Sequence, residues 1–595
     1  MSSTIAPLRA ARGPTEPGRP TGGMPRWPVI ALVLAMAAAA ALLLYLTRGF
    51  TFFYDEWNFL INRQAFTADA LLKPHNEHNV AVTVLLFKGA WELAGLGQYW
   101  VFRVLVVGLH LLCAGVLYVY ARRRVGPVLA LAPAVVLLFL GTAWEIILWP
   151  FEIQFMIPVT AGMGMLLFLE RRDPRSDLAA SGLLLLAFAS GSLGIPMAAG
   201  AAVEILFGGD RLRRVLRVLA VPVGLYLVWL SQYDPFRARF GTYGSVPQFV
   251  WDQLGSAIAA LAGFAFSSAR MPALVAGAAL ALLVAVAFIR GAVDRGRMAA
   301  IVTMALAYWG ALALYRPWVA DDEPSRYLYG GAVFVLLAGL ELARGRHAGH
   351  RTVAVVGVLA LVAVASNFDD MRDGAHRIRD YSDYVAPGLG ALELARGQVA
   401  ADFKPEPNRA PDIVAGRYFD AVDRWGSPAD TPKEIARRSE GAREAADVVL
   451  VEALRLELRP AAATRAAGTA PEPTQAAPGS VRRRGGCLSF VPGGTLAALD
   501  ARLPAGGIRV TAQGRPAVIQ LRRFADGFLP EGGTPGSALF ANNRQAFGRG
   551  LLRARTFQLA GGQTAVLRIA RDAAPRPWQA RFSTAGRLTA CGLPR

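Results

Sequence analysis

Long uncharged apolar runs recur along the first 367 residues, and they restrict this chain to a membrane protein. Hydrophobic residues make up 54% of the 595 residues, and charged residues only 18%. A helix needs about 17 to 25 apolar residues to cross the hydrocarbon core of a bilayer. The sequence therefore predicts an all-α polytopic membrane domain over residues 27–367. Its eleven expected spans are 27–47, 100–120, 127–147, 152–169, 178–191, 194–208, 213–231, 272–289, 298–315, 327–343 and 352–367.

The arginines predict how these spans are oriented. They cluster in every second connection, and the positive-inside rule places such loops in the cytoplasm. The formal net charge of +20 is therefore interpreted as a topology signal, and nucleic acid is not expected as a partner. The clusters are Arg122 to Arg124, Arg171 with Arg172 and Arg175, Arg211 with Arg213 and Arg214, Arg290 with Arg295 and Arg297, and Arg344 with Arg346 and Arg351.

The N-terminal residues predict a disordered cytoplasmic leader, 1–26, followed by a retained membrane helix. The first apolar run, 27–47, is too long for the core of a cleaved signal peptide. Two other apolar stretches, 80–97 and 249–268, would invert the arginine pattern if they crossed the membrane. We expect both to lie along its outer surface.

An odd number of crossings from a cytoplasmic N-terminus leaves residues 368–595 outside. Residues 368–460 are expected to be helical, because Thr431 and Glu434 form a capping box around Pro432 for a helix that runs towards Leu458. An Ala- and Pro-rich linker is predicted over 461–485. Short alternating segments then predict a small β-rich, sandwich-like domain over 486–595.

Two of the three cysteines bracket this β-rich domain. Cys487 and Cys591 are predicted to pair, which requires an oxidising compartment. The charge rule places the tail in such a compartment by an independent argument. Cys113 lies within an apolar run, where packing accounts for it.

The first outer loop carries an unusual set of polar residues. Asp55 and Glu56 are adjacent carboxylates directly after a membrane span, where they are costly to desolvate and suited to activating a hydroxyl. His75, Glu77 and His78 follow in the same loop. Substrate contact, metal contact and hydrogen bonds that hold the loop in place are all compatible with this second group.

This loop resembles that of the polytopic GT-C-type glycosyltransferases, the superfamily of protein O-mannosyltransferases and lipid A aminoarabinose transferases. In that family an acidic pair in the first extracytoplasmic loop supplies the catalytic carboxylate, which maps onto Asp55 and Glu56 here. The resemblance covers residues 27–367 and not the tail. It implies a sugar donor linked to polyprenyl phosphate and an acceptor that is a polysaccharide, a lipid or a protein.

The leaving phosphate of such a donor requires positive charge nearby, for which the arginine fork is suited. Arg326 is the first candidate, and pairing with Asp322 or Glu323 is its structural alternative. Tyr327, Glu152 and Gln154 complete the predicted substrate-binding set. Some members of the family use magnesium or manganese. The ligands of such a divalent cation here would be Asp55 and His78.

The prediction is therefore a glycosyltransferase of a bacterial inner membrane that acts on the outer face. Two other functions remain open. A transporter or flippase of lipid-linked sugars would place ionisable residues near the middle of the bilayer, where His110 and Glu204 are candidates. A non-catalytic membrane protein of envelope assembly would tolerate replacement of both Asp55 and Glu56.

Overall fold

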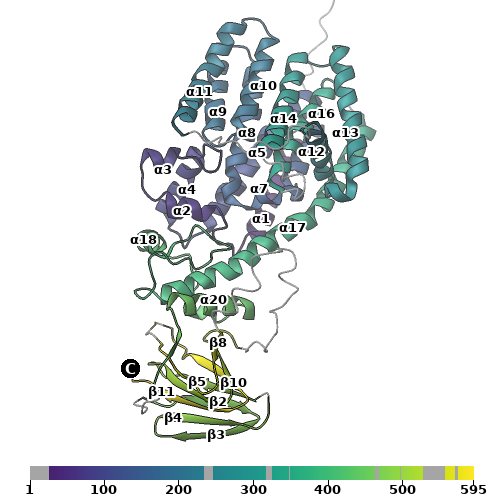
Figure 1. The fold of residues 1–595 in the computed structure, drawn as a ribbon. Coiled ribbons are helices and arrows are strands. Elements are labelled where there is room, and N and C mark those ends of the chain that lie inside the picture. Colours follow the sequence, from purple (N-terminus) through teal and green to yellow (C-terminus); the bar gives the residue numbers. More distant parts are fainter. Residues whose placement is uncertain are drawn as a thin grey trace, which may run out of the picture.

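A bundle of helices leads through one long helix into a second helical segment and then into a β region (Figure 1). The computed structural model describes residues 26–233, 246–315, 325–346, 349–462, 468–495, 497–526, 556–569, 572 and 574–594. The predicted leader, except for Arg26, lies outside the described residues.

All eleven predicted spans fall in helices. Seven described helices are long and apolar enough to cross a membrane, or eight if the bent pair α6 and α7 is one span. The chain is therefore a multi-pass membrane protein, while the number eleven stays a prediction because α9, α10 and α16 are shorter. The helices of the bundle are α1 (Trp27–Leu46), α5 (Trp100–Leu129), α6 (Leu131–Leu138), α7 (Trp144–Leu148), α8 (Ile153–Leu169), α9 (Pro174–Phe188), α10 (Gly194–Leu206), α11 (Arg211–Tyr233), α12 (Val246–Ala262), α13 (Phe266–Ile289), α14 (Arg295–Tyr315) and α16 (Leu328–Leu342).

Most of the stretch 249–268, which is predicted to lie along the outer surface, belongs to helix α12. It packs against α13, α14 and α16 within the bundle. Small residues explain the close approach, because a side chain added at Gly255 would meet the Phe266 ring at 2.6 Å. The other stretch expected on the surface, 80–97, forms α4 (Ala81–Ala94), which contacts α3 (Ala68–Leu72), α5 and α8.

Helix α17 (His350–Leu394) contains the last predicted span and continues beyond it for a further 27 residues. Its first part is largely exposed and apolar, and its last part is buried against α20 (Glu440–Ala453). The predicted boundary at residue 368 therefore falls inside one continuous helix.

The capping box at Thr431 is present: its side chain accepts from the Glu434 backbone, and the Glu434 side chain accepts in return. The helix that it begins, α19 (Pro432–Ile435), ends after one turn and does not run on towards Leu458. A second cap restarts the chain as α20, because Ser439 accepts a hydrogen bond from the backbone of Ala442. The remaining helix of this segment is α18 (Ala415–Trp425).

The β region consists of two antiparallel sheets, and it begins at Leu458. The predicted linker 461–485 is corrected, because it contains β2 and β3. Pro473 is tolerated since β2 is an edge strand with an irregular register at that point. The sheet orders are β1-β9-β6-β11-β4-β3 and β2-β5-β10-β7-β8. The strands are β1 (Leu458–Pro460), β2 (Glu472–Ala477), β3 (Gly479–Arg484), β4 (Cys487–Pro492), β5 (Ala497–Arg502), β6 (Ile508–Gln513), β7 (Ala517–Arg522), β8 (Thr556–Leu559), β9 (Thr564–Leu567), β10 (Gln579–Thr584) and β11 (Arg587–Gly592).

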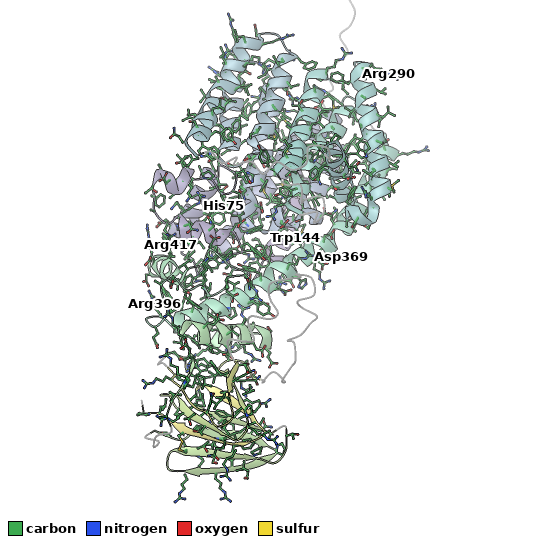
Figure 2. All side chains as sticks on the ribbon, in the orientation of Figure 1. His75, Trp144, Arg290, Asp369, Arg396 and Arg417 are labelled. Carbon is green, nitrogen blue, oxygen red and sulfur yellow. A yellow bond between two sulfur atoms is a disulfide. The ribbon has the colours of Figure 1, made fainter. Side chains whose placement is uncertain are left out.

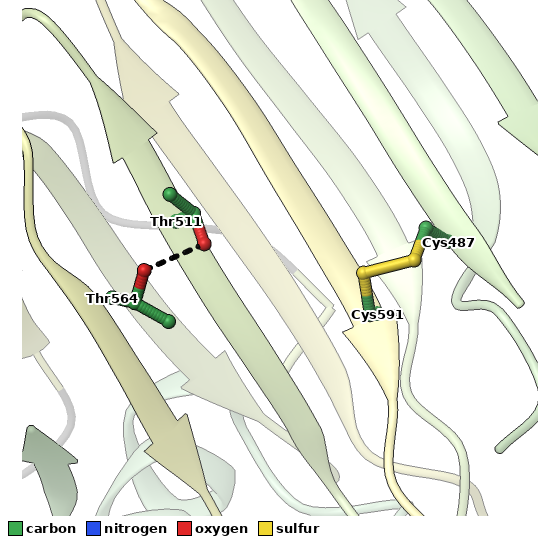
Figure 3. The surroundings of a disulfide bond; sticks show 4 residues. All are labelled: Cys487, Thr511, Thr564 and Cys591. Atoms are coloured by element: carbon green, nitrogen blue, oxygen red, sulfur yellow. Dashed lines mark hydrogen bonds between the residues drawn. A yellow bond between two sulfur atoms is a disulfide. The ribbon is translucent and has the colours of Figure 1, made fainter. Parts of the chain in front are cut away.

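The predicted disulfide between Cys487 and Cys591 is confirmed. The two residues lie directly opposite each other on β4 and β11, as Figure 3 shows. The third cysteine, Cys113, is free and buried. The bond closes a loop in which the two cysteines are 104 residues apart, so it restricts the unfolded chain of nearly the whole β region.

Replacing both cysteines by serine is expected to destabilise the β region by about 2–5 kcal/mol, the usual cost of losing a native disulfide. Thermal unfolding followed by limited proteolysis measures the effect. A reductant should lower the melting temperature of the wild type and leave that of the double variant unchanged. Equal melting temperatures for both proteins without reductant would show that the bond contributes nothing.

Candidate active site

The first outer loop folds into short helices at the end of the bundle that faces the tail. Helix α2 (Glu56–Asn62) begins directly after Asp55. Tyr54 has a φ of 41°, in the left-handed region that non-glycine residues avoid. Its backbone N–H donates to the Tyr381 hydroxyl at 3.2 Å, and its ring lies against the Tyr381 ring. The strained turn before Asp55 is thus held by α17, and strain of this kind is concentrated at functional sites.

The two adjacent carboxylates have opposite surroundings. The side chain of Asp55 is 38% exposed, whereas Glu56 is fully buried. Glu56 accepts hydrogen bonds from the Phe53 backbone at 2.7 Å and from the Tyr99 hydroxyl at 3.0 Å. Burial raises the pKa of Glu56 to about 8, although these hydrogen bonds and one from the Phe151 backbone act in the opposite direction. Asp55 is therefore the accessible carboxylate of the pair, and Glu56 holds the loop.

Replacing Glu56 by glutamine tests this assignment through pH. A carboxyl whose pKa is raised in the folded state stabilises the fold fully below about pH 4.5, and this stabilisation is lost as the pH rises through about 8. We expect the melting temperature of wild type to fall across this window and that of Glu56→Gln to stay flatter, with normal abundance. Glu92→Gln, at an exposed pair with Arg424, is the matched control. Parallel curves for wild type and Glu56→Gln would contradict the assignment.

His75 lies beside Asp55, with 3.5 Å between its Nε2 and the Asp55 Oδ2. Its ring packs edge-on against Phe59 and Phe151. A two-residue turn between His75 and His78, closed by two backbone hydrogen bonds, holds it there. Figure 2 shows His75 at the end of the bundle nearest the tail. An imidazole in this place can orient the Asp55 carboxylate or share its proton.

His78 and Glu77 attach the loop to the break between α9 and α10. The His78 Nδ1 lies 2.8 Å from the Ser192 hydroxyl, which donates to the Glu77 carbonyl at 2.9 Å. Gly191 is required here, because a side chain would meet the Gln154 carbonyl at 2.5 Å. For these two residues the structure favours the loop-holding alternative over contact with Asp55.

Arg326 forms the second half of the site, in the 3-10 turn η4 (Ser325–Tyr327). Its Nη1 lies 3.3 Å from Glu152 in the turn η2 (Pro150–Glu152), and its Nη2 lies 3.9 Å from Glu145. The Glu145 carboxylate also accepts from the Arg326 backbone at 2.9 Å and from the Ser325 hydroxyl at 3.0 Å. These carboxylates raise the pKa of Arg326, although burial opposes them, so its charge is permanent. The predicted alternatives Asp322 and Glu323 lie outside the described residues.

Aromatic rings join the two halves. Trp149 lies 4.9 Å from Phe53 between ring centroids, and the Arg326 guanidinium lies 6.0 Å over the Trp149 ring. Tyr327 packs edge-on against Phe155, and its carbonyl accepts from the Tyr308 hydroxyl. Trp149 and Tyr381 were not among the predicted site residues. Tyr381 contacts Tyr54 although 327 residues separate them, so no local pattern in the sequence indicates this contact.

Several buried polar atoms of this cluster lack hydrogen-bond partners among the described residues. They are the Glu152 Oε2, the Gln154 Oε1 and the Arg326 Nε. Unsatisfied buried polar atoms are costly, and several of them in one place are typical of a site that a ligand completes. The Arg326 Nε can donate to an anionic group, whereas the Glu152 and Gln154 oxygens can accept from hydroxyl groups.

The predicted divalent cation has no preformed cluster of ligands among the described residues. Within them no three His, Cys, Asp or Glu side chains come together as ligands. His78 bonds to Ser192, and Asp55 has His75 as its neighbour. Magnesium often takes only one or two protein carboxylates, with water and substrate phosphate as its other ligands, so Asp55 stays a predicted ligand.

The chain is similar in fold to two solved glycosyltransferases. ArnT from Cupriavidus metallidurans, bound to undecaprenyl phosphate, is 17% identical with a TM-score of 0.39, over 64% of this chain and 82% of that one. The Archaeoglobus fulgidus oligosaccharyltransferase, tethered with an acceptor peptide, is 13% identical with a TM-score of 0.40, over 69% of this chain and 60% of that one. The archaeal protein was also solved with Zn and sulfate, and with a dolichol-phosphate.

No protein-family model matches the chain, and no curated protein does so either. The roles proposed for the site residues therefore rest on the geometry of this chain.

Proposed function

We propose that this chain is a GT-C-type glycosyltransferase that moves a sugar from a polyprenyl-phosphate donor to an envelope acceptor on the outer face of a bacterial inner membrane. The observation that carries the proposal is the arrangement at the end of the bundle. An accessible carboxylate, Asp55, stands across a layer of aromatic rings from a permanently charged arginine, Arg326. One group can take a proton and the other can bind a phosphate.

The proposed reaction is a single displacement. Asp55 accepts the proton of the acceptor hydroxyl, whose oxygen bonds to the anomeric carbon of the sugar. The bond from that carbon to the lipid phosphate breaks at the same time, so the configuration at the carbon inverts. Arg326 stabilises the negative charge that develops on the departing polyprenyl phosphate. Glu56 and His75 act as positioning residues for Asp55.

Glu145 and Glu152 prepare Arg326 for this role. Their carboxylates hold the guanidinium beside Trp149, which limits the reorganisation needed when a phosphate arrives. Gln154, two residues beyond η2, offers its buried amide oxygen to a sugar hydroxyl. Tyr327 forms the wall next to Phe155.

The disulfide supports the proposed orientation. Such a bond persists in an oxidising compartment, which is the environment proposed for the tail. The tail also contacts the first outer loop directly: Asn58 donates to Asp412 at 3.1 Å, and Arg424 donates to Glu92 at 2.9 Å. The site and the tail therefore belong to one side of the membrane.

The test is transfer in proteoliposomes that contain the purified chain. Polyprenyl-phosphate donors with a labelled sugar should release free polyprenyl phosphate and label an envelope extract. Nucleotide sugars of the same label should give no product, because the proposed donor is a lipid. Activity with nucleotide sugars alone, or with neither donor class, would overturn the proposal.

The two candidates of the transporter alternative each have a partner within the bundle. The His110 imidazole lies 3.1 Å from the Tyr329 hydroxyl and 3.2 Å from the Leu138 carbonyl. Glu204 forms an ion pair with Arg297 at 2.6 Å. Both residues thus serve packing between helices, and neither requires a transport role to explain it.

A further inference from the structure

The six strands of the larger sheet differ in charge from the five strands of the smaller one. The larger sheet contains six arginines and no aspartate or glutamate within its strands. The smaller sheet contains three arginines and two acidic residues, and it includes the ion pair between Arg581 and Asp500 at 2.9 Å. The arginines of the larger sheet are Arg459, Arg482, Arg483, Arg484, Arg509 and Arg587.

Strand register gathers most of these arginines on one face. Arg459 and Arg509 both pair with Val566, Arg509 pairs with Cys591, and Arg484 pairs with Cys487. These paired residues form one row across all six strands, from Arg459 on β1 to Arg484 on β3. The disulfide lies within this row. The alternate residues of these strands, such as Ile508 and Val510, are buried in the core. The row consequently lies on the face that points away from the core.

A second row on the same face consists of hydroxyl side chains. Thr564 pairs with Thr511, Thr511 with Thr589, and Thr589 with Ser489. Figure 3 shows Thr511 and Thr564 beside the disulfide, joined by a hydrogen bond of 2.9 Å between their hydroxyl oxygens. Neighbouring strands lie about 4.8 Å apart, so these hydroxyls form a regular ladder next to the arginines.

One end of this face is hollowed. A groove with a volume of about 1180 Å³ lies between the end of α20 and strands β1, β6 and β9. Arg455, Arg459, Arg509 and Arg568 line it, together with one acidic residue, Glu457. Glu457 pairs with Arg459 at 3.1 Å, so positive charge remains in excess around the groove.

We propose that this face, defined by Arg459, Arg509, Arg568 and the Thr511 ladder, binds an acidic polysaccharide. Arginine forks suit the carboxylates of such a polymer, and the ladder suits its sugar hydroxyls. A flat row that ends in a groove fits an extended chain rather than a small ligand. The β region lies at the far end of the molecule from the membrane helices, so a polymer and not the bilayer is the occupant (Figure 1).

The experiment measures binding of fluorescent polygalacturonate to the full-length chain in nanodiscs. Neutral pullulan and polyglutamate of similar length serve as comparison polymers, and phosphatidylglycerol vesicles test a lipid surface. The variant replaces Arg459, Arg509 and Arg568 by serine. The control replaces Arg437, Arg502 and Arg515, which are exposed residues outside this face, by serine. Melting temperature and an intact disulfide verify that both variants are folded.

We expect wild type and the control to bind polygalacturonate more tightly than polyglutamate, and not to bind pullulan. The triple variant should bind at least about tenfold more weakly, the scale for losing three exposed charged contacts. Binding should also weaken as salt is added. Equal binding by the triple variant, equal affinity for polyglutamate, or binding to vesicles instead of the polymer would overturn the proposal.

This binding does not depend on sugar transfer. Asp55→Asn should bind polygalacturonate like wild type, because Asp55 lies in the first outer loop and not in the sheet. Loss of transfer with normal polymer binding therefore separates the two proposals, and so does loss of polymer binding with normal transfer.

Discussion

Sugar transfer is expected to fall by about 10²- to 10⁴-fold when Asp55 is replaced by asparagine, because a positioned general base contributes a factor of that size. Asparagine has nearly the same shape and cannot accept the proton. Asp55 is partly exposed and has His75 as its neighbour, so the fold should be unaffected. The measurement is the rate of labelled sugar transfer at equal protein abundance, with the donor concentration varied.

Asp69→Asn is the matched control, because Asp69 is an exposed acid of the same loop and the chemical change is identical. The maximal rate of transfer, measured at saturating donor, should fall only for Asp55→Asn. The donor concentration that gives half of the maximal rate should change little. Wild-type transfer by Asp55→Asn would remove Asp55 from the mechanism and favour the non-catalytic alternative.

Replacing Arg326 by alanine should lower transfer by at least about 10²-fold, the cost of removing one charged stabiliser of the transition state. It should also destabilise the chain by about 3–5 kcal/mol, because Glu152 would be left buried without its counter-charge. Both transfer and melting temperature therefore need to be measured.

A double variant separates the two effects. Arg326→Gln with Glu152→Gln removes both charges, so we expect the melting temperature to recover while transfer stays low. Arg270→Ala, which breaks an exposed ion pair with Asp252 at an outer helix end, should change neither quantity much. Recovery of transfer in the double variant would show that Arg326 serves stability alone.

Much of the helical architecture could be predicted because its cause is local. Each apolar run is long enough to form a helix, and the capping box at Thr431 needs only residues three apart. The course of α17 beyond residue 367 could not be predicted in this way. Its polar second part is helical because it packs against α20, and such packing overrides the local pattern.

The site, like the fold, could be predicted from the sequence only in part. Residue type and position indicated Asp55, His75 and Arg326, which the structure places around one set of aromatic rings. The different surroundings of Asp55 and Glu56 depend on the left-handed turn at Tyr54, which no spacing rule indicates. The partners of Arg326 are likewise 174 and 181 residues away, in the turn η2 and the helix α7 that the fold brings next to it.

Helix α17 sets the distance between the predicted last span and the site. The predicted last span ends at Asn367, whose side chain accepts from the Thr142 backbone at 2.9 Å. Tyr381, which contacts the turn before Asp55, follows 14 residues later, or about 21 Å along the axis. Because the helix is unbroken between them, its own backbone hydrogen bonds fix the spacing between the end of the predicted span and the turn before Asp55. For the proposed lipid-linked donor, we therefore expect this spacing to set how far the reacting carbon lies from the end of the predicted span.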